Sequence, residues 1–254
     1  MPLPRLAASL LLGLALSLPA AAQTAPFSDE QRKGIEAIVR DYLVKNPEVL
    51  QEAMTELERR QGEAQRQSQL KAVQDSREAL VNPARGVIAG NASGDVTLVE
   101  FFDYNCGYCK RALGDLRELM KADPKVRVVL KDFPVLGPGS VEASRVALAV
   151  KQQVNDARMF DFHAKLLETR GAVNGERALA VAREMGLDVA RIQKDMNAPE
   201  VQAILQENAS LGDKLGLTGT PAFVLGEEVI SGAVGLGPLR QAVGGIRQCG
   251  KTEC

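Results

Sequence analysis

The feature that most constrains the fold is a pair of cysteines, Cys106 and Cys109, placed directly after an apolar run. That run, "GDVTLVEFFDY", predicts a buried strand because it is rich in Val, Leu and Phe. From Cys106 to about Ala122 the pattern changes to helical, with leucines and a methionine on one side. We therefore expect Cys106 at a helix N-terminus and Cys109 one turn later, on the same side of the helix.

This position favours redox chemistry over a structural bridge or a metal site. Unpaired N–H groups and the helix dipole stabilise a thiolate, and such sites hold the cysteine pKa at about 3.5–7.5 instead of ~8.5. A structural disulfide more often closes a long loop. Zinc would need two further ligands, and the chain offers His163 and the remote Cys249 and Cys254. We expect no metal, and no organic cofactor because partner thiols supply the electrons.

The start of the chain indicates export. "MPLPRLAASLLLGLALSLPAAAQ" has a basic residue, a short apolar run and small residues, which predicts a signal peptide over 1–22, cleaved after about Ala22. The expected location is the periplasm, an oxidising compartment in which cysteine pairs persist as disulfides or act as redox groups. The 31 basic and 32 acidic residues nearly balance, and no basic cluster is interleaved with aromatics, so we expect no nucleic-acid partner.

Residues 23–82 predict a helical segment with a linker. Ser28 and Gln31 form a capping-box pattern, and Asn46 is expected to be the N-cap of a second helix. An apolar stripe runs along both helices: Ile35, Ile38, Val39, Tyr42, Leu43, Val49, Leu50, Ala53, Met54 and Leu57. Residues 61–69 are polar and Gln-rich, which we interpret as a spacer. Two such helices make no core alone, so self-association is favoured over docking on the main domain.

The rest of the chain, 83–254, predicts a strand, a helix, a second strand ("VRVVLKDFPV"), a helical insertion at about 140–217, a hairpin and a last helix. The hairpin strands are "PAFVLG" and "EEVISG". Pro221 opens the first of them after a Gly-Thr turn, where it is either a cis proline or an ordinary turn residue.

Three segments carry a resemblance to a known family: "VTLVEFFDYNCGYCKRAL", "KDFPVLGPGSVEASRVALA" and "GTPAFVLGEEVISGAVG". They resemble the DsbA-like branch of the thioredoxin superfamily, over about 94–247. The resemblance implies an α/β thioredoxin fold with a helical insertion, preceded by an N-terminal helical segment. That N-terminal segment is similar to the oligomeric ScsC- and Com1-like members.

The resemblance also implies roles for individual residues. Cys106 matches the nucleophile, Cys109 the resolving thiol, and Pro221 the cis-proline, with Thr220 before it. Glu100 matches a buried acidic residue that can relay the proton of Cys109; the alternative is a surface charge at a strand edge.

Two further expectations concern single sites. Lys131, in a buried-strand pattern, is a candidate partner for Glu100. Cys249 and Cys254, in "CGKTEC", predict a local structural disulfide, with a second exchange centre or a metal-binding tail as alternatives.

The dipeptide between the first two cysteines is Gly107-Tyr108, where strongly oxidising DsbA enzymes have Pro-His. The resemblance therefore implies a less oxidising centre, and the same C-G-Y-C occurs in the isomerase DsbC. We predict a periplasmic thiol–disulfide oxidoreductase, an oligomeric isomerase or reductase. The alternatives are a DsbA-type dithiol oxidase and a copper-binding or copper-tolerance protein. The expected partners are unfolded or misoxidised exported proteins, a membrane thiol redox partner, and further copies of the chain in a dimer or trimer.

Overall fold

A computed structural model describes residues 27–82 and 86–254 of the chain. The chain divides into two compact units, the first ending at Arg59 and the second beginning at Arg60, and each is described by itself. The predicted signal peptide lies outside the described residues. Within the described ranges, no helix combines the length and the apolar character that crossing a bilayer requires.

The first unit contains helix α1 (Asp29–Lys45) and the start of α2 (Glu48–Asp75). The predicted capping box is present, because the Ser28 N–H donates to Gln31 Oε1 at 2.8 Å and the Gln31 N–H to Ser28 Oγ at 3.2 Å. Asn46 differs from expectation. Its side-chain amide donates to the Tyr42 carbonyl at 2.8 Å, so it closes the C-terminus of α1 and does not cap α2.

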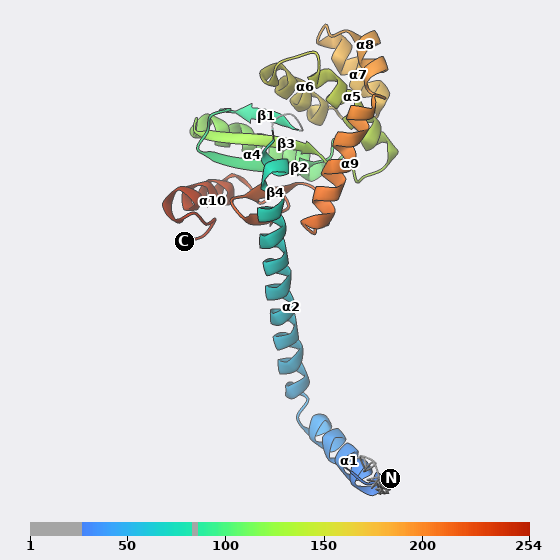
Figure 1. The fold of residues 1–254 in the computed structure, drawn as a ribbon, viewed down its shortest axis with the longest axis vertical. Helices are drawn as coiled ribbons and strands as arrows, with labels where there is room; N and C mark the ends of the chain where they lie inside the picture. Colours follow the sequence, from blue (N-terminus) through green and yellow to red (C-terminus); the bar gives the residue numbers. More distant parts are fainter. Residues whose placement is uncertain (1–26, 83–85) are drawn as a thin grey trace, which may run out of the picture. The chain divides into compact units, whose positions relative to one another are not determined.

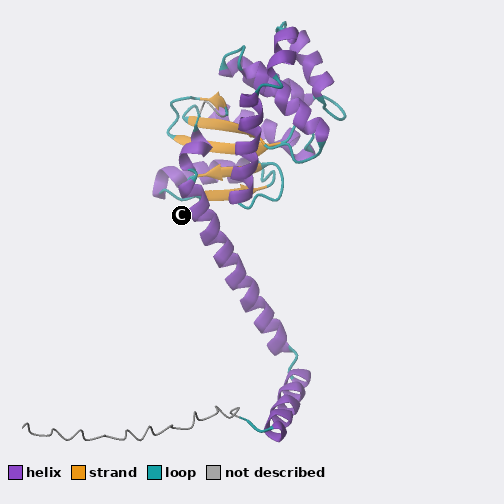
Figure 2. Cartoon of the chain, turned by 45° about the vertical axis from the view of Figure 1, so that its right-hand side comes forward, coloured by secondary structure: helices purple, strands orange, loops and turns teal. Residues whose placement is uncertain are grey.

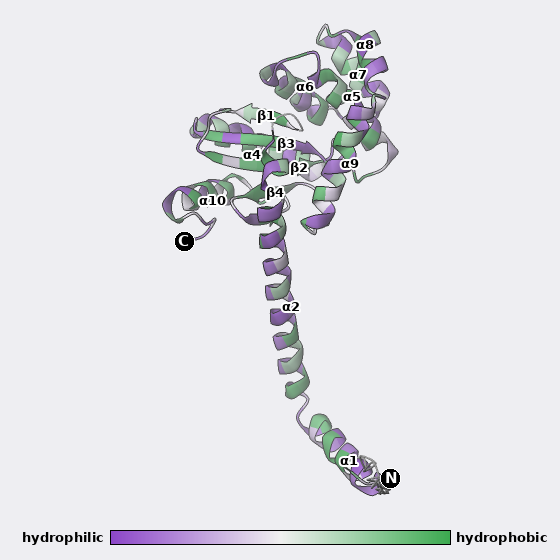
Figure 3. Ribbon diagram, in the orientation of Figure 1, coloured by the Kyte–Doolittle hydropathy of each residue, from purple (hydrophilic) through white to green (hydrophobic). Residues whose placement is uncertain are grey.

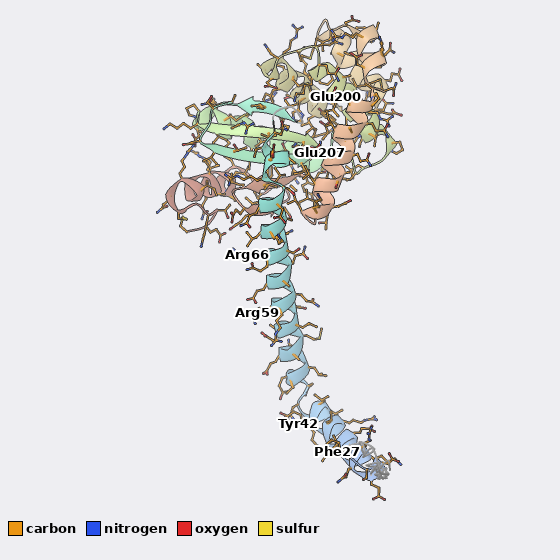
Figure 4. The ribbon with its side chains drawn as sticks, in the orientation of Figure 1. Phe27, Tyr42, Arg59, Arg66, Glu200 and Glu207 are labelled. Atoms are coloured by element: carbon orange, nitrogen blue, oxygen red, sulfur yellow. A yellow bond between two sulfur atoms is a disulfide. The ribbon has the colours of Figure 1, made fainter. Side chains whose placement is uncertain are left out.

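No described residue from 27 to 59 is buried. Nine large apolar side chains in this range are exposed: Phe27, Ile35, Ile38, Val39, Tyr42, Val44, Leu50, Met54 and Leu57. The ribbon of α1 carries hydrophobic and hydrophilic residues side by side (Figure 3). Phe27 (49 % exposed) and Tyr42 (55 % exposed) are labelled among the side chains in Figure 4. A complete apolar stripe thus lies on the surface of this unit.

The second unit begins within α2, which continues as a helix through the Gln-rich stretch. The interpretation of 61–69 as a mere spacer is wrong at its C-terminal end, where Gln69 Nε2 donates to the Leu215 carbonyl at 3.1 Å. Val73, at the end of α2, and Leu80, in α3 (Arg77–Val81), are buried against the sheet. The last turns of α2 therefore belong to the core of the second unit.

A five-stranded mixed sheet forms the centre of the second unit, in the order β1-β3-β2-β4-β5. Its strands are β1 (Val87–Gly90), β2 (Val96–Phe102), β3 (Val126–Asp132), β4 (Ala222–Leu225) and β5 (Glu228–Ser231). β2 and β3 are parallel, and the other three pairings are antiparallel. The sequence analysis missed β1, an edge strand of four residues that ends at Gly90, where φ is +72°.

Helices cover both faces of the sheet (Figure 2). One face packs against α4 (Gly107–Ala122) and α10 (Leu236–Cys249). The other packs against α3, the end of α2 and the end of α9 (Pro199–Lys214). Between β3 and β4 the chain forms α5 (Pro138–Lys151), α6 (Asp156–Glu168), α7 (Gly175–Glu184), α8 (Val189–Asp195) and α9 (Pro199–Lys214). This is the predicted insertion, and its helices gather in one group beside the sheet (Figure 1).

Candidate active site

Cys106 stands at the N-terminus of α4, as its N-cap residue. Its N–H donates to the Asp103 carbonyl at 3.0 Å, and its own carbonyl accepts the first helical bond, from Lys110 at 3.1 Å. Cys109 lies one turn later, completely buried, and both cysteines are free thiols. The end of β2 and the start of α4 thus deliver the two sulfurs to one place.

Thr220 contacts the first thiol. The Cys106 Sγ–H donates to the Thr220 carbonyl at 3.0 Å. The Thr220–Pro221 peptide bond is cis. Because Phe101 pairs with Ala222 across β2 and β4, this turn lies beside the end of β2, where the chain leads to Cys106. The proline and the cysteine pair are therefore neighbours in space, although about a hundred residues of chain separate them.

Glu100 is buried in β2, 1 % exposed, so the alternative of a surface charge is wrong. Burial, and then the negative charge of Cys106, raise the pKa of its carboxyl to about 8. Its Oε1 has no hydrogen-bond partner in the part of the chain that the structure describes. Burial raises the pKa of the Cys109 thiol as well, with the Glu100 charge as the second cause. The Cys109 thiol is thus protonated and lies in the field of a carboxyl whose pKa is about 8.

The expected pairing of Glu100 with Lys131 is wrong, and strand register gives the reason. Glu100 pairs with Leu130 and Phe101 with Lys131, so the two charged side chains point to opposite faces of the sheet. Lys131 Nζ instead donates to the carbonyl of Ala79, in α3, at 2.7 Å.

Two functional candidates escaped the sequence analysis: Asp103 and Asn105, in the loop before Cys106. The Asp103 carboxylate accepts from the Asn105 N–H (2.7 Å), the Leu136 N–H (2.9 Å) and the Ser140 hydroxyl (2.7 Å). Polar residues in a strand-to-helix loop are ordinary. The two partners of Asp103 outside this loop, Leu136 and Ser140, lie more than thirty residues away in the sequence. A single sequence therefore carries no signal for this network.

His163 is a packed residue and lies behind the loop that leads to Cys106. Its ring meets Phe102 edge-on at 4.5 Å between centroids, and burial lowers its pKa to about 3. In the opposite direction, burial raises the pKa of Asp132, at the end of β3, to about 7. His163 is therefore neutral at physiological pH, whereas Asp132 titrates close to that pH.

Cys249 and Cys254 are joined by a disulfide, with a Cα–Cα distance of 6.2 Å. The loop that it closes holds Thr252 in a buried position, where the hydroxyl bonds to Glu228 of β5. Nearby, Arg247 bridges Asp95 (2.6 Å) and Asp123 (2.5 Å), which fixes α10 to the start of β2 and the end of α4. This disulfide lies at the opposite end of β2 from the Cys106 thiol.

The model of the family "DSBA-like thioredoxin domain" matches residues 97–244, which is more than half of the chain. The chain belongs to this family. A second match, over residues 31–64, is to the "Copper resistance protein ScsC N-terminal domain". The two matched ranges include the cysteine pair and the exposed apolar stripe.

Solved structures of similar proteins agree with this family assignment. A thioredoxin-like oxidoreductase from Silicibacter pomeroyi is 43 % identical, with a TM-score of 0.65, and the match covers 68 % of this chain and 98 % of that one. A linker-deleted mutant of Proteus mirabilis ScsC is 30 % identical, with a TM-score of 0.64 and coverage of 85 % and 94 %. The thiol-disulfide exchange protein α-DsbA2 from Wolbachia pipientis is 28 % identical, with a TM-score of 0.66 and coverage of 72 % and 98 %.

A periplasmic thioredoxin-like protein from Salmonella enterica is similar too, 28 % identical over 65 % of this chain and 91 % of its own, with a TM-score of 0.57. The predicted thioredoxin fold with a helical insertion and an N-terminal helical segment is confirmed. The neighbours support a thiol–disulfide oxidoreductase of the DsbA and ScsC type.

Curated relatives include a Na(+)/H(+) antiporter, NhaA 1, of Salinispora arenicola, 26 % identical over 165 residues, which are 64 % of this chain. The chain spans about a quarter of the length of the curated relatives that it matches. With so small a shared part, the likeness carries no transport activity over to this chain.

Proposed function

We propose that the chain is an exported, periplasmic thiol–disulfide oxidoreductase that isomerises or reduces wrong disulfides in exported proteins, working as an oligomer. The observation that carries the proposal is the arrangement of two free thiols against the cis Thr220–Pro221 turn, with a buried carboxyl in β2 behind them. The reaction needs no organic cofactor, because electrons pass between sulfur atoms.

In the first step, the Cys106 thiolate attacks one sulfur of a client disulfide. A bond forms between Cys106 and that sulfur, and the other client sulfur leaves as a thiolate. The attacking sulfur stands at the N-terminus of α4, where the positive end of the helix dipole lies. The Thr220 carbonyl, within 3.0 Å of Cys106 Sγ, lies where the backbone of an incoming chain would run.

Two outcomes follow from the mixed disulfide. If another client thiolate attacks the client sulfur, Cys106 leaves as a thiolate, the client is isomerised and no net electrons move. If Cys109 attacks Cys106 Sγ, the client leaves as a thiol. The client disulfide has then been reduced by two electrons, and Cys106 and Cys109 have been oxidised to a disulfide. The second route needs a partner dithiol, the predicted membrane redox partner, to reduce the pair again.

Glu100 serves the second route as the proton acceptor for Cys109. While Cys106 is a thiolate, its charge raises the pKa of Glu100. Once Cys106 is bonded to the client that charge is gone, so Glu100 ionises more readily and Cys109 loses its proton more easily. Proton acceptance is thereby linked to formation of the mixed disulfide.

The N-terminal helices supply the oligomer in this proposal. Their exposed apolar side chains need a partner surface, and another copy of the same stripe provides one in a dimer or trimer. Several active sites held together would retain an unfolded client between rounds of exchange. The match to the ScsC N-terminal domain over 31–64 supports this reading.

The test is recovery of activity by scrambled, fully oxidised ribonuclease in a mild glutathione buffer. We expect the mature protein to restore activity, Cys106→Ser to restore none, and the double variant Ile38→Asp, Tyr42→Asp to lose oligomerisation and most of the isomerase activity. Ala37→Asp, exposed on the same helix but on the face away from the stripe, is the matched control. Substitution is preferable to deleting residues up to Leu80, because Val73 and Leu80 are part of the core.

The opposite result supports the oxidase alternative. A protein that quickly oxidises reduced ribonuclease, fails on the scrambled form, and is indifferent to the stripe variant would be a DsbA-type dithiol oxidase.

Copper binding is the second candidate function, favoured by the name of the family matched at residues 31–64. Cys106 and Cys109 offer two soft sulfur ligands that suit Cu(I). Within the described residues, no group of three or more His, Cys, Asp or Glu side chains is placed to hold a metal. A competitive Cu(I) titration tests this candidate: tight stoichiometric binding that Cys106→Ser abolishes, with negligible exchange activity, would favour it over the isomerase.

A further inference from the structure

Large apolar side chains on the surface of the second unit gather beside the cysteine pair. Among its described residues, those that are strongly exposed are Tyr108 (58 %), Val135 (48 %) and Leu136 (56 %). Tyr108 lies between the two cysteines in the sequence. The other two follow β3, whose end adjoins the end of β2 through the Phe133 N–H to Phe102 carbonyl bond of 2.8 Å. A cluster of this kind next to a reactive thiol marks a binding surface.

A pocket of about 470 Å³ opens beside one member of this cluster, Leu136. Three segments line it: the loop before Cys106, the turn from β3 into α5, and the loop between α6 and α7. The lining residues are all uncharged: Asn105, Leu136, Pro138, Gly139, Ser140, Gly171, Ala172, Val173 and Asn174. Asn105 directly precedes Cys106, so the wall of the pocket and the nucleophile share one stretch of backbone.

Hydrogen bonds hold these walls in place. The Val173 N–H donates to Asn105 Oδ1 at 2.6 Å, and Asn105 Nδ2 donates to the Val173 carbonyl at 2.8 Å. The Asp103 carboxylate fixes the opposite wall through Leu136 and Ser140. A pocket whose walls are fixed before a ligand arrives avoids the ordering cost that weakens binding.

One glycine leaves the rim open. Gly137 (φ +112°) has a backbone conformation that side-chain-bearing residues rarely adopt, and a Cβ there would meet no atom within 4 Å. At the other edge Gly171 (φ +79°) lies against Arg177, whose Nη1 would be 3.2 Å from a Cβ at this position. Another chain can therefore approach the backbone closely at Gly137.

We propose that this pocket is the subsite for the residue next to the attacked cysteine of an extended client chain, and that it selects an apolar side chain there. The inference rests on the proposed function and names its substrate preference. A cationic residue at that position is disfavoured, because the lining side chains carry no charge and two cations reach the backbone of the wall. Arg177 Nη1 donates to the Ala172 carbonyl at 3.1 Å, and Lys110 Nζ to the Gly171 carbonyl at 3.5 Å. Folded proteins bury apolar residues and unfolded ones expose them, so the subsite directs Cys106 to unfolded clients.

The experiment compares two disulfides with the reduced full-length protein. One is a short unstructured peptide whose cysteine, flanked by leucine, is linked to a small thiol; the other is hydroxyethyl disulfide, which has no side chain to fill the pocket. We expect Leu136→Asp and Ala172→Trp each to lower the ratio of the two rate constants by roughly tenfold, about the effect of losing the burial of one aliphatic side chain. Ala203→Trp, on the exposed side of α9, is the matched control and keeps the ratio of the parent protein.

A second comparison needs no variant. With the parent protein, a peptide that has lysine in place of the flanking leucine should react roughly tenfold more slowly. An unchanged ratio in both pocket variants, or equal rates for the leucine and lysine peptides, would overturn the subsite. A parent protein that exchanges with neither disulfide would overturn the proposed function instead.

Discussion

From 27 to 59 every described residue is at least partly exposed, whereas the second unit buries even Glu100 and Lys131 completely or nearly so. Both regions are rich in apolar residues at regular spacing, yet only one of them uses its apolar residues to build a core. The first presents a continuous stripe, which fits association with copies of itself. Among its described residues, the second strongly exposes three large apolar side chains, Tyr108 between the two cysteines and Val135 and Leu136 after β3, which fits brief contact with a client. The difference lies in what each apolar surface binds, and for how long.

The largest expected effect comes from making the same change in both regions. Leu80→Ala removes a fully buried side chain and should lower the free energy of unfolding by about 2–5 kcal/mol. Leu57→Ala, at an exposed position of α2, should change the unfolding of the second unit by less than about 0.5 kcal/mol and weaken self-association instead. Denaturant unfolding followed by far-UV circular dichroism measures the first effect, since the chain has no Trp, and sedimentation measures the second. Equal losses of stability would break the comparison.

How far the sequence predicts each region follows from the range of the interactions involved. The strand, the helix start at Cys106 and the capping box at Ser28 were predictable, because each depends on neighbours within a few residues. The burial of Val73 was not, because its partners in the sheet are distant and its neighbours in α2 are polar. The wrong pairing of Glu100 with Lys131 has the same origin, since only the register between β2 and β3 shows that they face opposite ways.

A smaller effect is expected from neutralising one carboxyl in each region. Glu100→Gln should slow the attack of Cys109 on the mixed disulfide by about a hundredfold, the lower end of what a positioned general base contributes. Glu52→Gln, exposed on α2, should leave that rate unchanged. Rapid-quench measurement of the mixed disulfide gives the rate. In the parent protein, the rate of attack by Cys109 should rise with pH as Glu100 ionises, with a midpoint at or below a pH of about 8. Glu100→Gln should lack this rise.

The same carboxyl has a thermodynamic signature. Its pKa is raised by folding from 4.5 to about 8, so the folded state binds the extra proton between these values, and stability falls as pH rises through that window. Glu100→Gln should therefore be more stable than the parent above pH of about 8 and similar to it near 4.5. If the two proteins have the same pH profile of stability, Glu100 is not the buried, neutral acid described here.

The smallest effect concerns the C-terminal disulfide, which has no counterpart in the described part of the first unit. Replacing Cys249 and Cys254 with serine should cost about 2 kcal/mol, the chain-entropy expectation for so short a loop. The change should be local: hydrogen exchange should rise around Thr252 and in β5, which Thr252 contacts through Glu228, and stay as it was in α1. Exchange catalysed by Cys106 should persist, because that thiol lies at the other end of β2. Loss of catalysis in this variant, with the fold intact, would show instead that the tail cysteines take part in electron transfer, and the contrast between a reactive pair and a structural pair would have to be abandoned.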